Sequence, residues 1–578
     1  MPIRVLPPEV AAQIAAGEVV ERPVSVVKEL LENAIDADAD DIAIDVLQGG
    51  RRLVRVRDDG CGIVAAEAEL AFQRHATSKI ESAEDLYRVR TLGFRGEALA
   101  SIAAVSRLTL STRAAGEEVG TLLRLEGGRV VQRELQARPV GTTVQVENLF
   151  FNTPARLKFL RADATEAGHI ARLVSSYALA YPSKRILLQH NEREVLRTTG
   201  TGQLFDVLVT LYGLDVAEEM VEIPEQREGE MRLSGYVGLP SLHRSNSQEL
   251  IFFVNRRWIQ DRSLAYAVRE AYHALLPQNR YPVAIVSVEL PPEEVDVNIH
   301  PTKQEVRFRH ARAVFTLVQR AVRSTLMGRH PFSVVQIPAG GTTWREERRH
   351  LPPLTPEQAR LGLEAQRTGD ISPGWGRIAP TEEEAAERLP MLRVIGQIAQ
   401  TYIVAEGPGG LYLIDQHAAH ERIRYETLKE QRARRQVASQ ELLDPVPVEL
   451  SPQQAILLEE HLTTLADFGL EVIPFGGTTF LVKRVPASLA GEDIPAALIE
   501  MLDAALEDGR PDFSWEEQAL ITLSCHTAVR AGQTLAIEEM RDLVRQLERS
   551  ALPHSCPHGR PTVMHMSHAQ IAQQFARR

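Results

Sequence analysis

Val26-Val27-Lys28-Glu29-Leu30-Leu31-Glu32-Asn33-Ala34-Ile35-Asp36-Ala37 is the first strongly periodic helix that the sequence predicts. Glu29 and Asn33 are four residues apart and therefore share one helical face. This spacing suits a carboxylate that activates water beside an amide that holds a metal ion, although it also occurs on solvated faces of ordinary helices. Alternating segments at Ile42–Val46 and Leu53–Arg57 then predict strands, so the fold mixes α and β from its start.

Three loops with unusual chemistry follow this helix. Asp58-Asp59-Gly60-Cys61-Gly62 comes after a predicted strand, where glycines permit a tight turn close to a planar ring and Asp58 can accept a hydrogen bond from an exocyclic amine. His75-Ala76-Thr77-Ser78-Lys79 comes next. Gly93-Phe94-Arg95-Gly96-Glu97-Ala98-Leu99 then leads into a helix, whose first N–H groups favour phosphate. Together with Gly141-Thr142-Thr143 at the start of another strand, these loops favour a nucleotide site over a series of ordinary turns.

Composition limits the class of protein. The 578 residues are too many for one core and predict three or four domains, and 44% hydrophobic with 25% charged residues is typical of a soluble globular protein. No apolar leader or membrane-length stretch occurs, and the three cysteines cannot form a disulfide framework, so we expect a cytoplasmic protein without membrane contact. Because the net charge is −12, any DNA contact must come from local basic surfaces.

Changes in composition along the chain predict its domain boundaries. Proline and glycine interrupt a charged stretch at residues 331–390, which we interpret as a flexible linker that spans about 40 Å. Residues 1–210 are predicted to form the first domain and residues 211–330 a second α/β subdomain. Residues 391–578 are predicted to form a C-terminal α/β domain.

A second group of polar side chains follows the linker. Leu411–Ile414 predicts a buried strand and Ala418 onward predicts a helix, so Asp415 and His417 lie where the two meet. His417 and Glu421 share a helical face, whereas Glu426 falls on the opposite side.

Two cysteines stand near histidines in the same region, in Ser524-Cys525-His526 and Cys556-Pro557-His558. Sulfur and imidazole suit Zn²⁺, and carboxylates suit Mn²⁺ or Mg²⁺. Each cysteine alone would more often be a small buried hydrophobe, but five such positions together favour a metal site.

The N-terminal motifs resemble the ATPase of the MutL mismatch-repair family, within the class that also contains gyrase, the large heat-shock chaperones and histidine kinases. The stretches that distinguish the MutL branch are Gln13-Ile14-Ala15-Ala16-Gly17-Glu18-Val19-Val20, Gly93–Leu99 and Phe151-Asn152-Thr153-Pro154-Ala155-Arg156. The resemblance implies ATP and Mg²⁺ as cofactors, with Glu29 as general base and Asn33 as the Mg²⁺ ligand. It implies adenine contacts from Asp58 and Thr143, and a pocket shaped by Gly60 and Gly62. The implied lid over the phosphates consists of Thr77, Ser78, Lys79, Gly93, Phe94, Arg95, Gly96, Glu97, Ala98 and Leu99.

The second subdomain also carries family motifs. Asp296-Val297-Asn298-Ile299-His300-Pro301-Thr302-Lys303 matches the segment that supplies a lysine to the γ-phosphate, which makes Lys303 the candidate and implies closure on ATP. Asn255-Arg256-Arg257-Trp258 and the helix after it resemble the DNA-facing surface of the family. DNA contacts are therefore expected from Arg256, Arg257, Arg262 and Arg269, with solvated helix arginines as the alternative.

Asp415 to Glu426 matches the D-Q-H-A-x-x-E-x-x-x-x-E signature of the MutL branch that nicks DNA, and the Cys525, Cys556 and Phe575-Ala576-Arg577 motifs accompany it. The resemblance implies a metal-dependent endonuclease in which Asp415 and Glu421 are catalytic ligands. The implied metal ligands are Asp415, His417, Glu421, Cys525, Cys556 and His558. Ser524-Cys525-His526 and His420 depart from the commoner pattern, which leaves open whether His526 or His420 joins the site.

Gln440-Glu441-Leu442-Leu443-Asp444-Pro445 fits the Q-x-L-x-x-P peptide that binds the replication sliding clamp in this family. Gln440, Leu442 and Pro445 would be the anchors. A loop before a strand is the alternative interpretation.

The sequence patterns and the family resemblance together predict an α+β multidomain protein with an N-terminal α/β-sandwich ATPase, a second α/β subdomain, a linker and a C-terminal domain. The resemblance implies that the C-terminal domain serves dimerisation and endonuclease activity, and that the protein is an ATP-switched nicking endonuclease of mismatch repair. It also implies four partners: DNA, a mismatch-recognition protein of the MutS family, the sliding clamp and a second copy of the chain. A matchmaker that recruits other repair proteins without nicking is the alternative. A histidine kinase would need a phospho-accepting helix ahead of its ATP site, and the segment before Glu29 is too short for one. A chaperone interpretation would leave the motif from Asp415 to Glu426 without an explanation.

Overall fold

The computed structural model describes residues 14–79 except 15 and 18, and then residues 91–93, 96–273, 275–277, 280–296, 306–329, 389–434, 436–506, 515–526 and 534–574. The linker region 330–388, Phe94, Arg95, Lys303 and Phe575–Arg577 lie outside the described residues. The chain divides into two compact units, Met1–Arg329 with Thr427–Ala528 and His330–Glu426 with Val529–Arg578, and the boundary falls within helix α11 (Gln416–Ala433). Among the described residues, no helix is long and apolar enough to cross a membrane.

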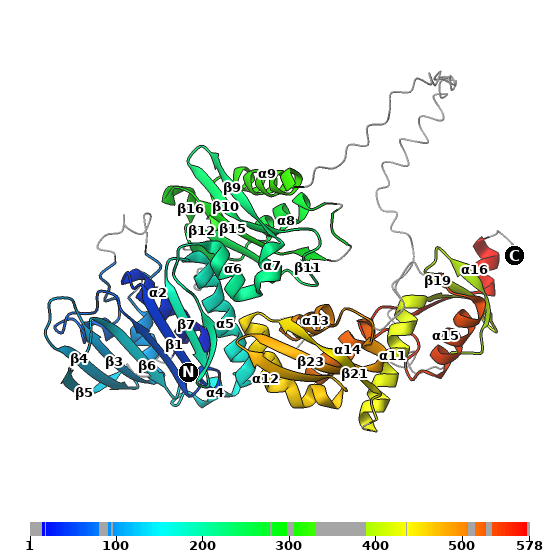
Figure 1. The fold of residues 1–578 in the computed structure, drawn as a ribbon, viewed down its shortest axis with the longest axis horizontal. Helices are drawn as coiled ribbons and strands as arrows, with labels where there is room; N and C mark the ends of the chain where they lie inside the picture. The colour runs from blue at the N-terminus through cyan, green and yellow to red at the C-terminus, as the bar shows by residue number, and fades with distance from the viewer. Residues whose placement is uncertain are drawn as a thin grey trace, which may run out of the picture. The chain divides into compact units, whose positions relative to one another are not determined.

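The first unit begins with a mixed eight-stranded sheet of order β5-β4-β3-β6-β2-β1-β7-β8 (Figure 1). Strand β1 runs antiparallel to β2 and parallel to β7, a pairing that joins segments about 140 residues apart in sequence. The strands are β1 (Asp41–Leu47), β2 (Leu53–Asp58), β3 (Arg107–Arg113), β4 (Gly120–Glu126), β5 (Arg129–Gln136), β6 (Gly141–Glu147), β7 (Arg185–His190) and β8 (Arg193–Arg197).

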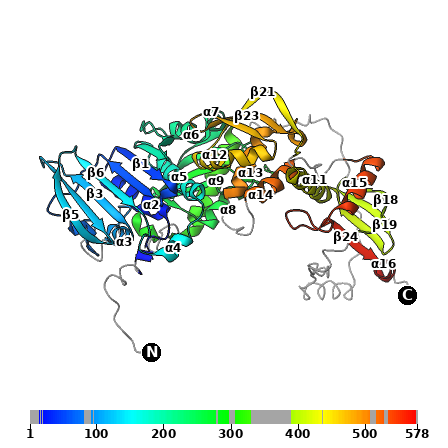
Figure 2. The same cartoon turned by 90° about the horizontal axis from the view of Figure 1, so that it is seen from below.

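Helices α2 (Pro23–Asp36) and α5 (Asp163–Ala180) pack against each other and against this sheet, as Figure 2 shows from below. Proline at its first position suits α2, because a helix N-terminus leaves that N–H without an intrahelical partner. The apolar face of α2 is buried through Val26, Val27, Leu30 and Leu31. The periodicity predicted from the sequence therefore corresponds to a helix that presents Glu29 and Asn33 away from its most buried stripe. The shorter helices of this part are α3 (Ala98–Ala104), α4 (Pro154–Lys158), α6 (Leu204–Tyr212) and α7 (Leu214–Glu218).

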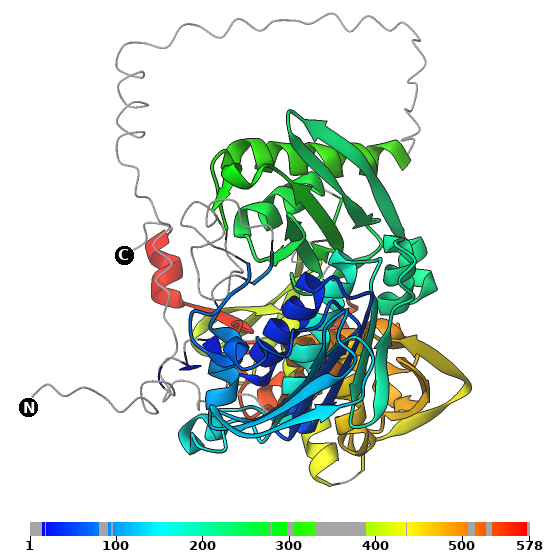
Figure 3. The ribbon, with the colours of Figure 1, turned by 90° about the vertical axis from the view of Figure 1, so that its left-hand side faces the viewer.

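The second subdomain contains a five-stranded sheet of order β13-β12-β15-β10-β9. All five residues of β12 are buried, because β12 lies between β13 and the parallel strand β15 and is covered by helices. Helices α8 (Arg262–Ala271) and α9 (Ala311–Arg329) pack on each other, and α9 lies along β9 and β10 (Figure 3). The strands are β9 (Met220–Glu228), β10 (Met231–Gly238), β12 (Leu250–Val254), β13 (Arg257–Ile259) and β15 (Ala284–Glu289), with short pairs β11 (His243–Arg244) with β14 (Tyr281–Pro282) and β16 (Val295–Asp296) with β17 (Arg307–Phe308).

The remaining part of the first unit, after α11, is built around a three-stranded sheet of order β21-β23-β22. Its strands are β21 (Ser439–Glu449), β22 (Glu471–Gly476) and β23 (Thr479–Pro486), and its helices are α12 (Pro452–Asp467), α13 (Ile494–Leu506) and α14 (Trp515–His526). A capping box starts α12. The Ser451 hydroxyl accepts from the backbone N–H of Gln454, and the side-chain oxygen of Gln454 accepts from the backbone N–H of Ser451.

The second unit is a four-stranded antiparallel sheet of order β18-β19-β20-β24. Its strands are β18 (Arg393–Ile398), β19 (Tyr402–Gly407), β20 (Gly410–Asp415) and β24 (Val563–Ser567), and its further helices are α15 (Ile537–Arg549) and α16 (His568–Gln574). Ile403 and Ile414 project from one sheet face into a core shared with α11 and α15. The α+β multidomain fold expected from the sequence is thus confirmed. Short 3-10 helices occur at Gln48–Gly50, Leu70–Phe72, Pro292–Glu294 and Ala487–Leu489.

Candidate functional site

The polar face of α2 meets two of the predicted loops. The Lys79 ammonium donates to Asn33 Oδ1 at 2.9 Å and forms an ion pair with Asp36 Oδ2 at 2.6 Å. Asp36 also accepts from the backbone N–H groups of Leu92 at 2.9 Å and Gly93 at 3.0 Å. The structure therefore brings together the helix, the His75–Lys79 segment and the start of the glycine-rich loop, and Asp36 is the residue that connects them. We predicted no role for Asp36, although its place three residues after Asn33 puts it on the same face.

The glycine-rich loop itself lies against the segment before it. Gly96 has a φ of 63°, and a Cβ there would come within 2.5 Å of the Ala76 carbonyl oxygen, so only glycine fits. Glu97 precedes helix α3 and pairs with His75 at 3.3 Å between Oε1 and Nδ1. Within the predicted lid, the Thr77 hydroxyl accepts from the Lys79 amide at 3.2 Å, and Leu99 packs against the core. Ser78 lies between Thr77 and Lys79 in the sequence, and Ala98 is the first residue of α3.

The loop after β2 is organised around Asp58. One oxygen, Oδ1, accepts from the backbone N–H groups of Gly60 at 3.0 Å and Thr142 at 3.1 Å. Burial raises the pKa of Asp58, while these two donors oppose the rise. Both bonds end on Oδ1, which leaves Oδ2 able to face an exocyclic amine.

The expectation for Thr143 needs correction. Thr142 is buried beside Asp58, and its hydroxyl lies 3.1 Å from that of Thr112, whereas Thr143 is the next residue of β6. Successive side chains of a strand point to opposite faces, so Thr143 projects away from the face on which Asp58 and Thr142 meet. Thr142 is the threonine that the structure places at this loop.

The four arginines assigned to DNA have different environments. Arg262 and Arg269 are exposed on α8, and the Arg269 guanidinium lies 4.9 Å from the centre of the Tyr281 ring. Arg256 occupies a turn at a φ of 64°. Arg257 is only 8% exposed and donates to the carbonyl oxygens of Thr91 and Leu92. The prediction that Arg257 faces DNA is therefore wrong, because its guanidinium is enclosed by the protein.

The polar residues at the start of α11 have well-defined partners. Asp415 Oδ1 accepts from the backbone N–H groups of His417 at 2.9 Å and Ala418 at 3.1 Å, so this carboxylate caps the helix. The Asp415 amide in turn donates to the Thr562 carbonyl at 2.9 Å, which fixes the strand end beside the segment leading to β24. This capping position explains why the chain changes from strand to helix at Asp415.

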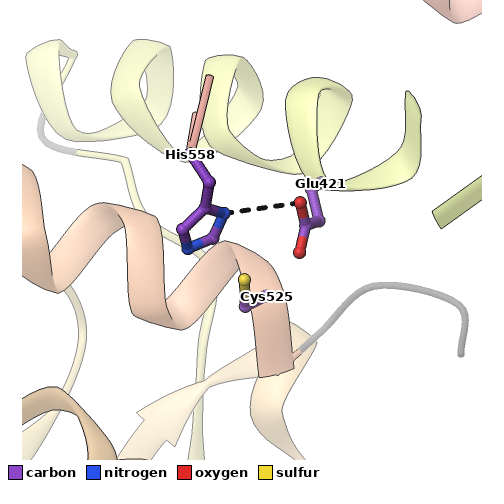
Figure 4. A group of neighbouring side chains, drawn as sticks. All are labelled: Glu421, Cys525 and His558. Carbon is purple, nitrogen blue, oxygen red and sulfur yellow. Dashed lines mark ion pairs between the residues drawn. The ribbon is translucent and has the colours of Figure 1, made fainter. Parts of the chain in front are cut away.

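Glu421 is the centre of the metal-ligand group. Its side chain is 3% exposed and lies 3.1 Å from His417 Nε2 and 3.5 Å from His558 Nδ1, each measured to one of its two oxygens. Glu421 and His558 both belong to the second unit, and Figure 4 shows their side chains facing each other, whereas Cys525 belongs to the first unit. A buried carboxylate between two imidazoles is a donor set that suits zinc.

The loop that carries His558 is held to α11 by side chains other than the predicted ligands. Arg422, which is buried, donates through Nε to the Ser555 carbonyl at 2.6 Å. Glu426 accepts from the backbone N–H groups of Ala551 at 2.8 Å and Leu552 at 3.2 Å. Glu426 thus holds the start of this loop, while Glu421 lies against His558 within it. Sequence reasoning assigned no role to Arg422, since its acceptor lies 133 residues away.

Cys556 lies inside the same loop. It is 1% exposed, and its backbone closes a turn, with its amide donating to the Arg560 carbonyl at 2.8 Å and its carbonyl accepting from the Gly559 amide at 2.9 Å. His420 has a pKa lowered to about 4, mainly by burial and also by the nearby charge of Arg424. The side chain of His526 lies outside the described residues.

The predicted clamp peptide occupies an irregular part of β21. Pairing with β23 runs through Glu441 opposite Arg484 and resumes at Val446 opposite Val482. The intervening residues therefore bulge from the sheet, and the Leu443 side chain is 98% exposed. The segment is a bulged strand and not the loop before a strand that we considered as the alternative.

Comparison with known proteins adds independent findings. The family model for the histidine kinase-, DNA gyrase B- and HSP90-like ATPase matches residues 21–147. The model for the C-terminal domain of DNA mismatch repair protein matches residues 208–327, and the model for the MutL C-terminal dimerisation domain matches residues 395–535.

Among curated proteins, the DNA mismatch repair protein MutL of Desulforudis audaxviator is 42% identical over 576 residues, covering 100% of this chain and 99% of its own length. The MutL of Methanoculleus marisnigri is 42% identical over 583 residues with the same coverage. Among solved structures, the Aquifex aeolicus MutL ATPase domain complexed with ADP is 27% identical, covering 52% of this chain and 98% of that one at a TM-score of 0.38.

Proposed function

Because the chain belongs to the MutL family of DNA mismatch repair proteins and carries an ATPase domain, we propose that it nicks DNA in a metal-dependent reaction that ATP controls. The observation that carries this proposal is the buried Glu421 carboxylate, which lies between the imidazoles of His417 and His558. A buried glutamate contacted by two histidines is costly to maintain unless a positive charge compensates it. The donor set therefore fits a cation.

The residues would divide the work as follows. His417, Glu421 and His558 would hold zinc, and the family motifs offer Cys525 and Cys556 as further ligands. Asp415 and Glu421 would supply carboxylates for Mn²⁺ or Mg²⁺. Bound cations would neutralise the phosphodiester and favour attack by water. Asp415 would at the same time keep the helix start in place through the bonds it already makes.

ATP would control this reaction from the N-terminal site. Glu29 would act as general base and Asn33 as the Mg²⁺ ligand, next to Lys79, which already donates to the Asn33 oxygen. Asp58 would accept from adenine, and Thr142 in place of Thr143 would be the threonine beside it, since the Thr142 backbone N–H donates to Asp58. Lys303 would bring the second subdomain to the γ-phosphate when the arm closes.

The proposed partners are DNA, a MutS-family mismatch-recognition protein, the sliding clamp and a second copy of the chain. The matched dimerisation domain supports a homodimer. The outward face of the four-stranded sheet is the surface proposed for it, because Ile398, Tyr402 and Met564 are each about half exposed there. The bulged Gln440–Pro445 peptide is proposed for the clamp, where Gln440→Ala with Leu442→Ala should abolish clamp-stimulated nicking.

The test is Mn²⁺-dependent nicking of supercoiled plasmid by the full chain, measured with and without ATP. Asp415→Asn should abolish nicking but leave ATP turnover intact, whereas Glu430→Gln, an exposed position on the same helix, should change neither. Metal analysis of the purified protein should find zinc, and Cys525→Ser should lower it. Nicking that persists in Asp415→Asn would contradict the endonuclease proposal and favour the matchmaker that only recruits other repair proteins.

A further inference from the structure

The segment Thr91–Gly93 is held from two sides. From α2, the Asp36 carboxylate accepts from the amides of Leu92 and Gly93, at 2.9 and 3.0 Å. From β13, the Arg257 guanidinium donates to the carbonyls of Thr91 and Leu92, the latter at 3.2 Å. Both the N–H and the C=O of Leu92 are therefore used, by charged side chains from different subdomains. Because this segment leads directly into the glycine-rich loop, its position sets where that loop begins.

Arg257 is itself rigidly placed. It follows the two-residue turn Asn255-Arg256 between β12 and β13, in which both residues have positive φ, at 49° and 64°. Such a turn suits the twist of a hairpin, although Arg256 pays a conformational cost at that φ because it has a side chain. The Asn255 side chain accepts from the Leu290 amide at 2.9 Å, and the Asn255 amide donates to the Val288 carbonyl at 3.0 Å. The hairpin is thereby fixed to the central strand β15 of the second subdomain.

A buried guanidinium needs its hydrogen bonds, since an ionised group that is removed from water without partners is strongly unfavourable. For Arg257 these partners include the two carbonyls of the Thr91–Gly93 segment. If the second subdomain shifts relative to the first, Arg257 must either pull this segment with it or lose bonds inside the protein. The planar guanidinium of arginine holds two neighbouring carbonyls through separate nitrogen atoms in a fixed geometry, whereas a lysine presents all its donors from one nitrogen.

We propose that Arg257 is a positioning residue that couples the second N-terminal subdomain to the nucleotide loop, and that it makes no contact with DNA. This inference rests on the proposed ATPase function of the N-terminal site. It gives the second subdomain a connection to the ATP site that is already formed in this structure and that is separate from the proposed Lys303 contact. If the loop moves when a nucleotide binds, the Arg257 side chain would transmit this movement to β12, β13 and the exposed arginines of α8.

The experiment compares the full chain with Arg257→Ala, Arg257→Lys and the control Arg232→Ala. The control removes a positive charge from β10 of the same subdomain, where Arg232 is exposed and pairs with Glu289 at 2.8 Å. We expect Arg257→Ala to raise KM for ATP about tenfold, more than it changes kcat, with Arg257→Lys recovering only part of the loss. Arg232→Ala should leave both constants unchanged. DNA affinity of Arg257→Ala and its dependence on salt should match those of the unaltered chain.

Hydrogen exchange at the Leu92 and Gly93 amides provides a second measurement that does not require ATP turnover. Exchange there should accelerate about tenfold in Arg257→Ala and not in Arg232→Ala. Unchanged exchange, or a reduced salt slope of DNA binding with unchanged ATP constants, would overturn the inference. If the unaltered chain hydrolyses no ATP, the proposed function fails, while the exchange result still decides the role of Arg257. If Arg257→Ala does not fold, Arg257→Lys is used for the same comparison.

Discussion

Replacing Glu426 with alanine tests whether the metal site depends on a carboxylate that is not a ligand. Glu426 accepts two backbone hydrogen bonds, from Ala551 and Leu552, and its side chain is 25% exposed. A buried hydrogen bond to a charged group contributes about 1.5–3 kcal/mol. Because Glu426 is partly exposed, losing its two hydrogen bonds should cost about 2 kcal/mol in total. The loop that they anchor carries His558, so zinc affinity should fall about 30-fold, within the range found when groups that orient metal ligands are removed.

The assay is titration of zinc against a chromophoric chelator, using the full chain. Glu430→Ala is the matched control, because Glu430 lies one turn further along α11 and pairs with the exposed Arg434. Unchanged zinc affinity in Glu426→Ala would refute the reasoning. Should the unaltered chain bind no zinc, the zinc proposal itself would be wrong, and faster amide exchange at Ala551 and Leu552 in the variant would still measure the anchor.

Three further outcomes follow from the structure. Burial raises the pKa of Asp503 from 3.8 to about 7, so the folded state loses stability as the pH rises from about 4 to about 7. Asp503→Asn should therefore melt at a higher temperature than the unaltered chain at pH 8 but not at pH 4. The difference in stability is at most about 4 kcal/mol, and equal melting temperatures at pH 8 would contradict it. Gly62→Ala should weaken nucleotide binding more than Gly116→Ala does, as measured by titration of a fluorescent nucleotide. Both glycines have a positive φ, but only at Gly62 would the added Cβ meet a backbone oxygen, that of Arg113 at 2.1 Å. Arg262→Glu should lower DNA affinity and reduce the salt slope by about one unit, and an unchanged slope would remove Arg262 from the DNA surface.

Sequence periodicity was sufficient for the local elements. Alternation predicted β1 and β2, and the 3.6-residue period predicted α2, because each pattern reflects burial of one face against the rest of the fold. The pairing of β1 with β7 could not be predicted in the same way, since parallel pairing depends on a crossover and leaves no local pattern. The arrangement of sheets therefore came from the family resemblance and the structure.

The site residues show a similar limit. Spacing placed Glu29 with Asn33 and His417 with Glu421 correctly on shared helical faces. It could not distinguish Thr142 from Thr143, because strand register decides which of two adjacent threonines meets Asp58. It also could not reveal that Arg257 is buried, because a surface arginine and an enclosed one look alike until the acceptor carbonyls, about 165 residues away, are in place.

Asp36 and Glu426 have the same physical role at two unrelated sites. Each lies on a helix that carries a proposed catalytic carboxylate, and each uses its two oxygens to accept from two consecutive backbone amides, Leu92 and Gly93 for Asp36 and Ala551 and Leu552 for Glu426. A carboxylate suits this task because it has two acceptor atoms and no donor, so it matches a pair of adjacent N–H groups that would otherwise be costly to bury. Each of the two loops also carries other residues proposed for its site, namely the glycine-rich loop residues in the first case and His558 in the second.

This similarity separates two kinds of acidic residue in these motifs. Substituting the carboxylate that anchors a loop should weaken ligand affinity, because the loop must then be ordered when the ligand binds. Substituting the carboxylate proposed for the chemistry should lower the rate at saturating ligand instead. Asp36→Asn should therefore raise KM for ATP more than it lowers kcat, whereas Glu29→Gln should lower kcat and leave ATP binding nearly unchanged. The opposite pattern would mean that motif position and hydrogen-bond partners do not determine the role of these residues.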